Sequence, residues 1–254
     1  MQLHSLHLSL AEYGIFLSIM AGLATGIGAL PLLFLRRRIS DFLIDMALGF
    51  AAGVMLSAAA FSLIEPALKR GGAPALLAGI ILGLVFVDVI DKKIPHDHFV
   101  KGHEGPGYKS SSNNILLFVI AIAIHNFPEG LAVGVGGFSK EALSLTFAIG
   151  IQNVLEGLAV AASLIAAGYG IGYASWVAFL TGLVEPFGAI IGVTMVNFSA
   201  AFLPYALAFA GGAMLFVISD EVIPETHMGN HQRPATYAII FGFMLMTILD
   251  YLVG

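Results

Sequence analysis

The sequence predicts an all-α integral membrane protein with eight transmembrane helices, and three observations support this fold class. Hydrophobic residues make up 58% of the 254 residues and charged residues only 11%, against about 25% charged in an average soluble domain. The mean hydropathy is +0.93. Apolar runs recur along the whole length. We therefore expect residues 1–254 to form a single transmembrane domain, in a multi-pass protein of the cell (inner or plasma) membrane.

The eight predicted spans follow from the apolar runs, because a helix needs about 20 mostly apolar residues to cross a bilayer. The runs are continuous rather than alternating, which favours helices over a β-barrel. They lie at about 13–35, 42–64, 74–91, 114–137, 141–166, 171–197, 203–223 and 236–253. The first span ends at three arginines, two glycines (71 and 72) separate the second from the third, and the polar stretch 92–113 separates the third from the fourth. Gly136 and Gly137 mark a tight turn between the fourth and fifth.

Basic residues collect in one set of loops, and this asymmetry predicts the orientation. One set of alternate loops contains eight of them, Arg36, Arg37, Arg38, Lys92, Lys93, Lys101, Lys109 and Arg233, and the other contains Lys69, Arg70 and Lys140. These are all 11 Lys and Arg residues, so no predicted span contains one. The positive-inside rule then places both termini outside and the loop 92–113, which contains histidines, in the cytoplasm.

Composition also narrows the chemistry. The net charge of −5 and the lack of basic clusters argue against a nucleic-acid partner. Cysteine is absent, so a metal site in this chain would have to use His, carboxylate, amide or thioether ligands.

A short motif occurs twice, in the fourth and fifth predicted spans. HNFPEGLAV (125–133) and QNVLEGLAV (152–160) share Asn, Glu, Gly, Leu, Ala and Val at an offset of 27 residues. The two spans are joined by a tight turn, and each motif lies about 18–22 Å along its helix from that turn. We therefore expect the two motifs to meet near the middle of the membrane.

Polar side chains inside the spans mark the candidate site. Those of the two motifs and the sixth span are His125, Asn126 and Glu129 in the fourth span, Gln152, Asn153 and Glu156 in the fifth, and Glu185 in the sixth. Without Lys or Arg in the spans, the three carboxylates are either protonated or hold a cation among them. One imidazole with carboxylate and amide oxygens suits a first-row divalent ion. Simple hydrogen bonding between helices is the alternative for any one of these residues, but it accounts poorly for a pattern that is repeated at ligand spacing.

The sequence HNFPEG, followed in the next span by QNVLEG, resembles the ZIP family of divalent metal transporters, in particular its bacterial GufA-type branch. The resemblance extends over GVMLSAAAFSL (53–63), DKKIPHDH (91–98), VEPFG (184–188) and SDEVIPETH (219–227). It implies eight helices with both termini outside, a two-metal site between the fourth, fifth and sixth helices, and often a homodimer. It also implies transport of a divalent metal from outside into the cytoplasm, with zinc as the leading cargo and iron, manganese or cadmium as alternatives.

The resemblance also implies a ligand set. One metal position would use His125, Glu129, Gln152 and Glu156 with Met55 nearby, and the second would use Asn126, Glu129, Asn153, Glu156 and Glu185. Position 153 is Asn where relatives often have Asp, which removes a negative charge from the second position. Position 155 is Leu where relatives usually have Pro, so the fifth helix should be straighter.

A second, cytoplasmic cluster could hold the exiting ion through weaker ligands. Its candidates are Asp91, His96 and His98, which keep a family spacing, and Glu221, His227 and His231 near the end of the seventh span. Solvated loop histidines are the alternative interpretation.

The rival function from another class is a membrane-embedded metallohydrolase or protease. Such an enzyme needs a catalytic base beside a metal that keeps an open position, commonly in an H-E-x-x-H motif. HNFPE is not that motif, and weak amide ligands suit a cargo that must leave. We therefore expect a transporter and not an enzyme.

Overall fold

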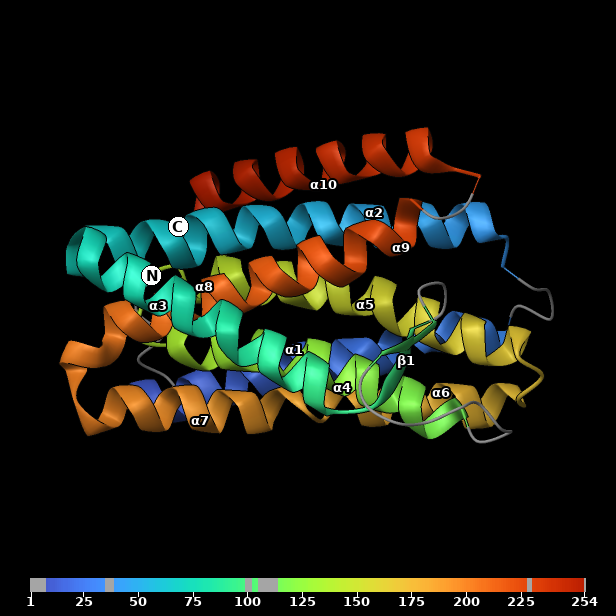
Figure 1. The fold of residues 1–254 in the computed structure, drawn as a ribbon, viewed down its shortest axis with the longest axis horizontal. Helices are drawn as coiled ribbons and strands as arrows, with labels where there is room; N and C mark the ends of the chain where they lie inside the picture. Colours follow the sequence, from blue (N-terminus) through green and yellow to red (C-terminus); the bar gives the residue numbers. More distant parts are fainter. Residues whose placement is uncertain (1–7, 35–38, 99–101, 105–113, 228–229, 254) are drawn as a thin grey trace.

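The computed structural model describes residues 8–34, 39–98, 102–104, 114–227 and 230–253, and it is almost entirely helical in these ranges (Figure 1). The first half contains α1 (Leu10–Phe34), α2 (Asp41–Ser57), the π-helix η1 (Ala58–Ile64), α3 (Glu65–Lys93) and two short strands, β1 (His96–His98) and β2 (Gly102–Glu104). The second half contains α4 (Asn114–Gly136), α5 (Ala142–Ala166), α6 (Ile171–Gly182), α7 (Glu185–Phe198), the short 3₁₀ helix η2 (Ala200–Phe202), α8 (Leu203–Val217), the π-helix η3 (Ile218–Val222), α9 (Ile223–His227) and α10 (Gln232–Val253).

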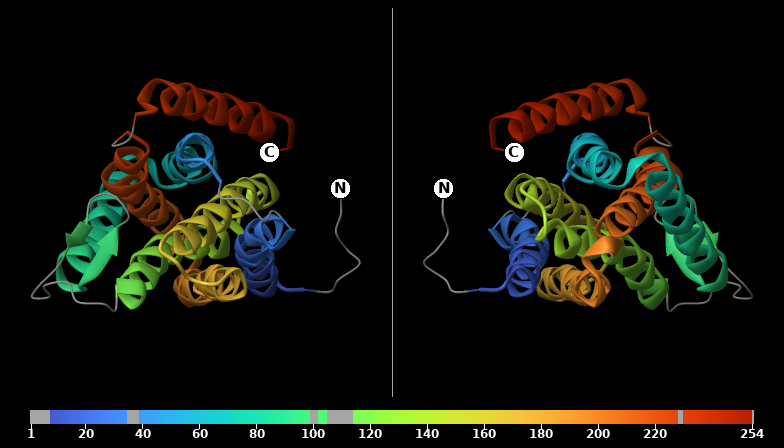
Figure 2. Two further views of the ribbon diagram at one scale, coloured as in Figure 1. Left: turned by 90° about the vertical axis from the view of Figure 1, so that its right-hand side faces the viewer. Right: turned by 90° about the vertical axis from the view of Figure 1, so that its left-hand side faces the viewer.

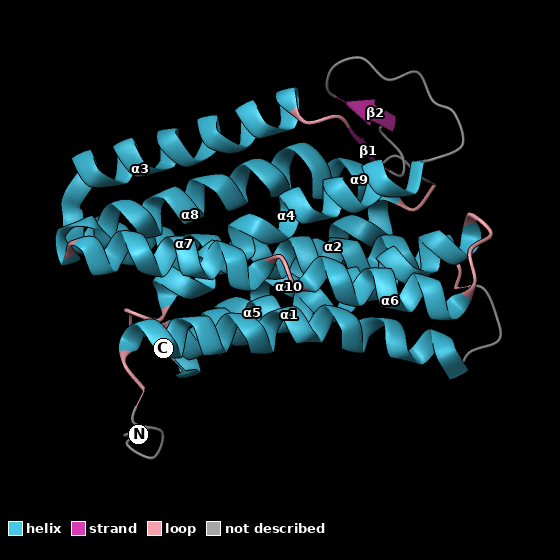
Figure 3. Cartoon of the chain, turned by 90° about the horizontal axis from the view of Figure 1, so that it is seen from below, coloured by secondary structure: helices cyan, strands magenta, loops and turns pink. Residues whose placement is uncertain are grey.

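Seven helical segments among the described residues are long and apolar enough to cross a membrane. One of them, Asp41–Lys93, has 53 residues and folds back on itself at Gly72, where φ is 66° and ψ is −175°. A positive φ is readily adopted only by glycine. Beyond this reversal, α3 runs back beside α8, as Figures 1 and 3 show.

The helix before Gly72 is longer than the sequence predicts. It continues past residue 64 through Glu65 and Lys69, which form an ion pair one turn apart, with side chains 44% and 70% exposed. Charged side chains at a helix end can extend to water and pair at i,i+4. For this reason hydrophobicity alone places the end of this helix too early.

The predicted span 171–197 is two helices. α6 ends at Gly182 and α7 begins at Glu185. Pro186 stands in the first turn of α7, where the missing N–H of proline costs no helical hydrogen bond. The interruption places the Glu185 carboxylate at the beginning of a helix, inside the bundle.

The helices form two groups. In the first, α3 packs on α8 and α10 packs on α2; in the second, α1 packs on α5 and α6, and α4 packs on α7. Contacts of α2 with α5, and of α4 with α8, join the groups. Figure 2 shows α10 on the outside of the bundle, next to α2.

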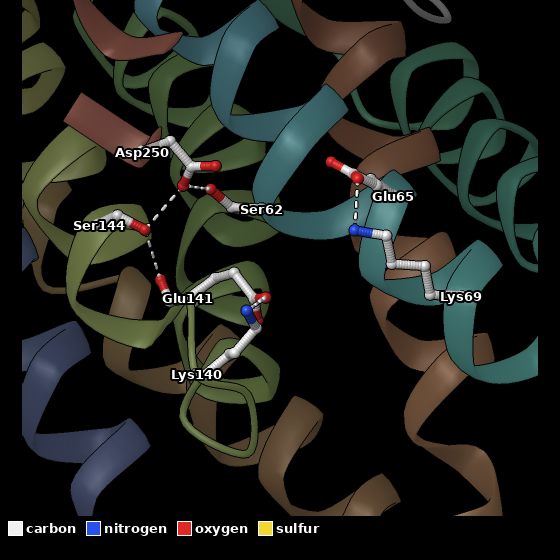
Figure 4. Close-up of polar contacts among 7 residues, drawn as sticks. All are labelled: Ser62, Glu65, Lys69, Lys140, Glu141, Ser144 and Asp250. Atoms are coloured by element: carbon white, nitrogen blue, oxygen red, sulfur yellow. Dashed lines mark hydrogen bonds and ion pairs between the residues drawn. The ribbon is translucent and has the colours of Figure 1, made fainter. Parts of the chain in front are cut away.

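A polar network ties α10 to both groups. Asp250 of α10 accepts hydrogen bonds from Ser62 of η1 at 2.9 Å and from Ser144 of α5 at 2.8 Å (Figure 4).

The outer surface carries large apolar side chains such as Phe198 and Tyr251, as expected for helices that face lipid. The interior is built largely from small residues, which let helices in a membrane approach closely.

Candidate metal centre

The two repeated motifs meet in the structure through their side chains. Gln152 of α5 donates a hydrogen bond from Nε2 to Oε1 of Glu129 on α4 at 2.6 Å, and both side chains are fully buried. The first and second motifs are thus in direct contact inside the helix bundle, as the sequence predicts.

The second motif also reaches α7 and α1. Asn153 donates from Nδ2 to Oε1 of Glu185 at 2.7 Å and to the backbone carbonyl of Ala21 at 2.9 Å. This pair of bonds brings the third predicted carboxylate next to the second motif. Elements from three parts of the chain therefore converge on one buried region.

The asparagine of the first motif has a different partner. Asn126 donates from Nδ2 to the carbonyl of Thr181 at 2.9 Å, in the last turn of α6. This bond connects α4 to the helix end that precedes Glu185.

Glycines one residue after each motif glutamate allow the helices to come this close. A Cβ atom on Gly130 would lie 1.9 Å from the carbonyl oxygen of Glu185, and one on Gly157 would lie 1.9 Å from that of Thr25. Both distances are far inside van der Waals contact. Only glycine at these positions lets α4 meet α7, and α5 meet α1, at the depth of the carboxylates.

Six predicted ligand residues each retain a buried oxygen without a hydrogen-bond partner. These oxygens are Asn126 Oδ1, Glu129 Oε2, Gln152 Oε1, Asn153 Oδ1, Glu156 Oε1 and Glu185 Oε2. Buried polar atoms are normally paired, and an unpaired one is costly. Carboxylate and amide oxygens are cation ligands, so this set of oxygens has the chemistry to accept a metal ion.

The charged groups of the site act on one another. Glu129 interacts electrostatically with Glu156 and Glu185, and Glu156 interacts with His125. Such a concentration of carboxylates favours a divalent cation, which offsets their mutual repulsion.

Carboxylate and histidine side chains alone do not form a complete set of metal ligands. Across the residues that the structure describes, no group of three or more His, Asp and Glu side chains is positioned to hold a metal ion. The amides lie between them, since Gln152 bonds to Glu129 and Asn153 bonds to Glu185. A cation here would need amide oxygens as well, which is the mixed ligand set that the sequence predicts.

His125 lies close to Glu221, which the sequence predicts to belong to the cytoplasmic cluster. Its Nδ1 atom lies 3.0 Å from Oε2 of Glu221 and 3.2 Å from the carbonyl oxygen of Ala121. Glu221 is 1% exposed and lies in η3. Its position inside the predicted span 203–223 was the signal that it belongs with the other intramembrane carboxylates.

Comparison with known proteins places the chain in a family. Residues 96–250 match the family model described as the ZIP zinc transporter. The chain is 45% identical over 253 residues to zinc transporter GufA of Myxococcus xanthus, with 95% of this chain and 99% of the relative covered. It is 46% identical over 249 residues to zinc transporter ZIPB of Bordetella bronchiseptica (91% and 78% covered), and 33% identical over 304 residues to human zinc transporter ZIP11 (84% and 89% covered). The chain belongs to the ZIP zinc transporter family.

Membership of the ZIP family confirms the resemblance inferred from the two motifs. Members of this family are transporters and not enzymes, so the metallohydrolase alternative is set aside. Family membership and the apolar helices together identify the chain as a multi-pass protein of the plasma membrane.

Met55, a predicted neighbour of the ZIP metal site, is fully buried on α2. It belongs to the same apolar cluster as Leu131, which lies in the first motif, and Ile149, which lies just before the second. Its role as a ligand stays a prediction.

The six candidates for a release cluster lie in several places. Asp91 is buried in the last turn of α3, and the backbones of His96 and His98 lie in β1, opposite Glu104 and Gly102 of β2. This hairpin, in which His103 is also a strand residue, packs beside α4.

The other three release candidates bond to different parts of the protein. Glu221 contacts His125, whereas His227 hydrogen-bonds with Thr226 and Thr236, and His231 bonds to Asp45 at 2.9 Å. A single cluster of all six residues stays a prediction, and Glu221 is the member whose contact leads toward the metal site.

Proposed function

We propose that this ZIP protein carries zinc across the membrane into the cytoplasm through a site on α4, α5 and the α6–α7 segment. The transport would be a conformational process without a covalent step, in which the ligands become accessible from one side and then the other. Iron, manganese and cadmium are alternative cargoes that the same mixed ligand set can hold.

The observation that carries this proposal is the set of six buried oxygens without hydrogen-bond partners, contributed by both motifs and Glu185. A helix-stabilising polar network would pair its acceptors. A cargo site leaves acceptors for an ion, and weak amide ligands allow that ion to leave.

We propose eight membrane spans with both termini outside, in one transmembrane domain over residues 1–254. Reversal of the 53-residue segment at Gly72 supports eight spans from seven apolar segments. Figure 3 supports an even number, because α1 begins and α10 ends at the same end of the molecule. The excess of Lys and Arg in the opposite set of loops supports the orientation.

The homodimer implied by the ZIP resemblance is also part of the proposal. Light scattering of the purified protein in detergent would measure a mass of two chains if it is correct, and of one chain if it is wrong.

Uptake by proteoliposomes tests the proposed function. Vesicles that contain the protein and a trapped zinc-sensitive dye should take up zinc faster than protein-free vesicles, and competing metals added outside should rank the alternative cargoes. A matched variant, Glu65→Gln, changes a half-exposed carboxylate outside the site and should transport normally. Uptake no faster than in protein-free vesicles would contradict the proposal.

A further inference from the structure

One carboxylate connects the two helix groups near the end of the bundle at which α10 ends. Oδ1 of Asp250 on α10 accepts a hydrogen bond from Ser62 of η1 at 2.9 Å and another from Ser144 of α5 at 2.8 Å (Figure 4). α10 and η1 pack in the group of α2, α3 and α8, whereas α5 packs in the group of α1. The bond from Ser62 therefore lies within one group, and the bond from Ser144 crosses from one group to the other.

Breaking the bond from Ser144 would leave neither side chain without a partner. The Ser144 hydroxyl also lies 3.0 Å from the backbone carbonyl oxygen of Glu141, at the start of its own helix, and it can donate there instead. Asp250 would keep its hydrogen bond from Ser62. Much of the cost of breaking a buried hydrogen bond comes from groups that are left unpaired. The contact between the groups can therefore open at a lower cost than one whose partners have no alternative.

The packing between the two groups changes along the bundle. Near the serines, Ala148 of α5, one turn from Ser144, and Ala59 of η1, one turn from Ser62, are fully buried. Deeper in the bundle, residues 151–155 of α5 and 43–50 of α2 line an open apolar pocket of about 490 Å³. The two groups are thus closed against each other where Asp250 lies and are incompletely packed further along.

We propose that the Ser144–Asp250 contact is a latch between the two helix groups, which closes the route from outside to the metal site. In the proposed orientation, the start of α5 and the end of α10 face outside. Separation of α5, which carries the second motif, from α10 would break the latch. The inference deepens the proposed function and rests on it, because it names a contact that must open before the ligands become accessible from outside.

The latch predicts different roles for two otherwise similar serines. An interaction shifts a conformational equilibrium only by the difference in its strength between the two states. The bond from Ser144 is present in the closed state and lost on opening, so Ser144→Ala should favour opening. Ser62→Ala removes a bond of the same kind to the same oxygen atom. Because Ser62 and Asp250 belong to one group, that bond is present in both states and its loss should not affect opening.

Thiol labelling measures the opening, because the chain contains no cysteine. A single cysteine is introduced at a fully buried position, either as Ala148→Cys on α5 or as Ala59→Cys on η1. Each protein is purified in detergent without zinc and exposed to a water-soluble maleimide, and the labelling rate is followed by mass spectrometry. Ser144→Ala should raise the labelling rate of both cysteines about 10-fold or more, as expected for the loss of a hydrogen bond to a charged group. Ser62→Ala should leave both rates unchanged.

The two cysteine positions distinguish opening of the latch from local loosening. Neither serine substitution changes a charge, so the reactivity of the thiol itself is preserved, and each variant is labelled well below its thermal unfolding midpoint. Local loosening would raise the labelling rate only at the cysteine next to the replaced serine, and this result would overturn the latch. It would also be overturned if Ser144→Ala left both rates unchanged, or if Ser62→Ala raised both as much as Ser144→Ala.

Failure of the proposed function would look different, because labelling requires neither zinc nor transport. A faster labelling rate in Ser144→Ala alone, combined with no zinc uptake by proteoliposomes, would refute the proposed function and retain the latch as a contact between moving groups. Normal zinc uptake, combined with no effect of Ser144→Ala on labelling, would refute the latch and retain the proposed function.

Discussion

The two motifs have the same spacing but different surroundings. In the first, Glu129 is fully buried and its Oε1 accepts a hydrogen bond from Gln152; in the second, Glu156 is 9% exposed. Each glutamate also has one oxygen without a hydrogen-bond partner. Asn126 bonds to a backbone carbonyl of α6, whereas Asn153 bonds to the carboxylate of Glu185. The repeated motif therefore sets how deep its side chains lie along the helix and on which face. The neighbouring helices determine what each copy of the motif contacts.

The glycines show what the two motifs do share. Gly130 and Gly157 each remove the side chain where a neighbouring backbone crosses, α7 in the first motif and α1 in the second. The repeat of Glu-Gly therefore has a common structural meaning: a carboxylate is placed next to a close crossing of two helices.

Loss of either motif carboxylate should have the largest effect. Glu129→Ala and Glu156→Ala should each abolish zinc uptake by proteoliposomes, because both carboxylates are proposed to contact both metal positions. Glu65→Ala, at a half-exposed position outside the site, should transport normally. Wild-type uptake by either motif variant, reconstituted in equal amount, would refute the assignment of that carboxylate.

Replacement of the two motif glycines by alanine should have the next largest effect, on stability. The added methyl of Gly130→Ala or Gly157→Ala would overlap a backbone carbonyl at 1.9 Å, and overpacking of this kind costs about 1–3 kcal/mol or more. Thermal unfolding in detergent should show a clearly lowered midpoint for both variants.

Gly150 on α5 supplies the matched control for the glycine variants. A Cβ atom there would meet nothing within 4 Å, and alanine is the better helix former by about 1 kcal/mol. Gly150→Ala should leave the midpoint unchanged or raise it. Equal midpoints for all three variants would mean that the close crossings do not limit stability.

An added carboxylate should distinguish the two asparagines. Asn153 faces Glu185, so Asn153→Asp adds a negative charge beside another carboxylate and should strengthen a second metal position. Asn126→Asp adds the same charge, and both changes lose the bonds that the amide donates. Because Asn126 faces a backbone carbonyl and not a second carboxylate, its gain should be smaller. Calorimetric titration with zinc measures both, and equal or absent gains would show that position 153 has no special role.

The smallest effect is expected outside the motifs, in the hairpin. Combined replacement of His96, His98 and His103, the strand residues of β1 and β2, should slow zinc uptake without abolishing it. Full loss of uptake by a correctly inserted protein would show that the hairpin is part of the essential path.

The sequence predicted those features of the fold and the site that depend on hydrophobicity or on residue spacing. Hydrophobicity predicted the long apolar helices, because lipid leaves a polar backbone no alternative to the helix. It could not locate the break before Pro186, since both sides of that break are apolar. Residue spacing predicted that the candidate ligands share helix faces.

The spacing of residues along the sequence could not predict which side chains form hydrogen bonds between helices. Nothing along the chain indicates that Asn153 bonds to Glu185 while Asn126 bonds to Thr181, because these contacts depend on which helices lie side by side. The contact between Glu221 and His125 was missed for the same reason, because it joins η3 to α4, which lie far apart in the sequence.

Zinc K-edge X-ray absorption of the zinc-loaded protein tests the central claim most directly. We predict that zinc has one imidazole nitrogen neighbour, at about 2.0–2.1 Å, with oxygen atoms as the remaining neighbours. The imidazole contribution should disappear in His125→Gln and persist in the variant that lacks His96, His98 and His103. Two or more imidazoles around zinc, or an imidazole that remains in His125→Gln, would contradict a metal centre built from the two motifs.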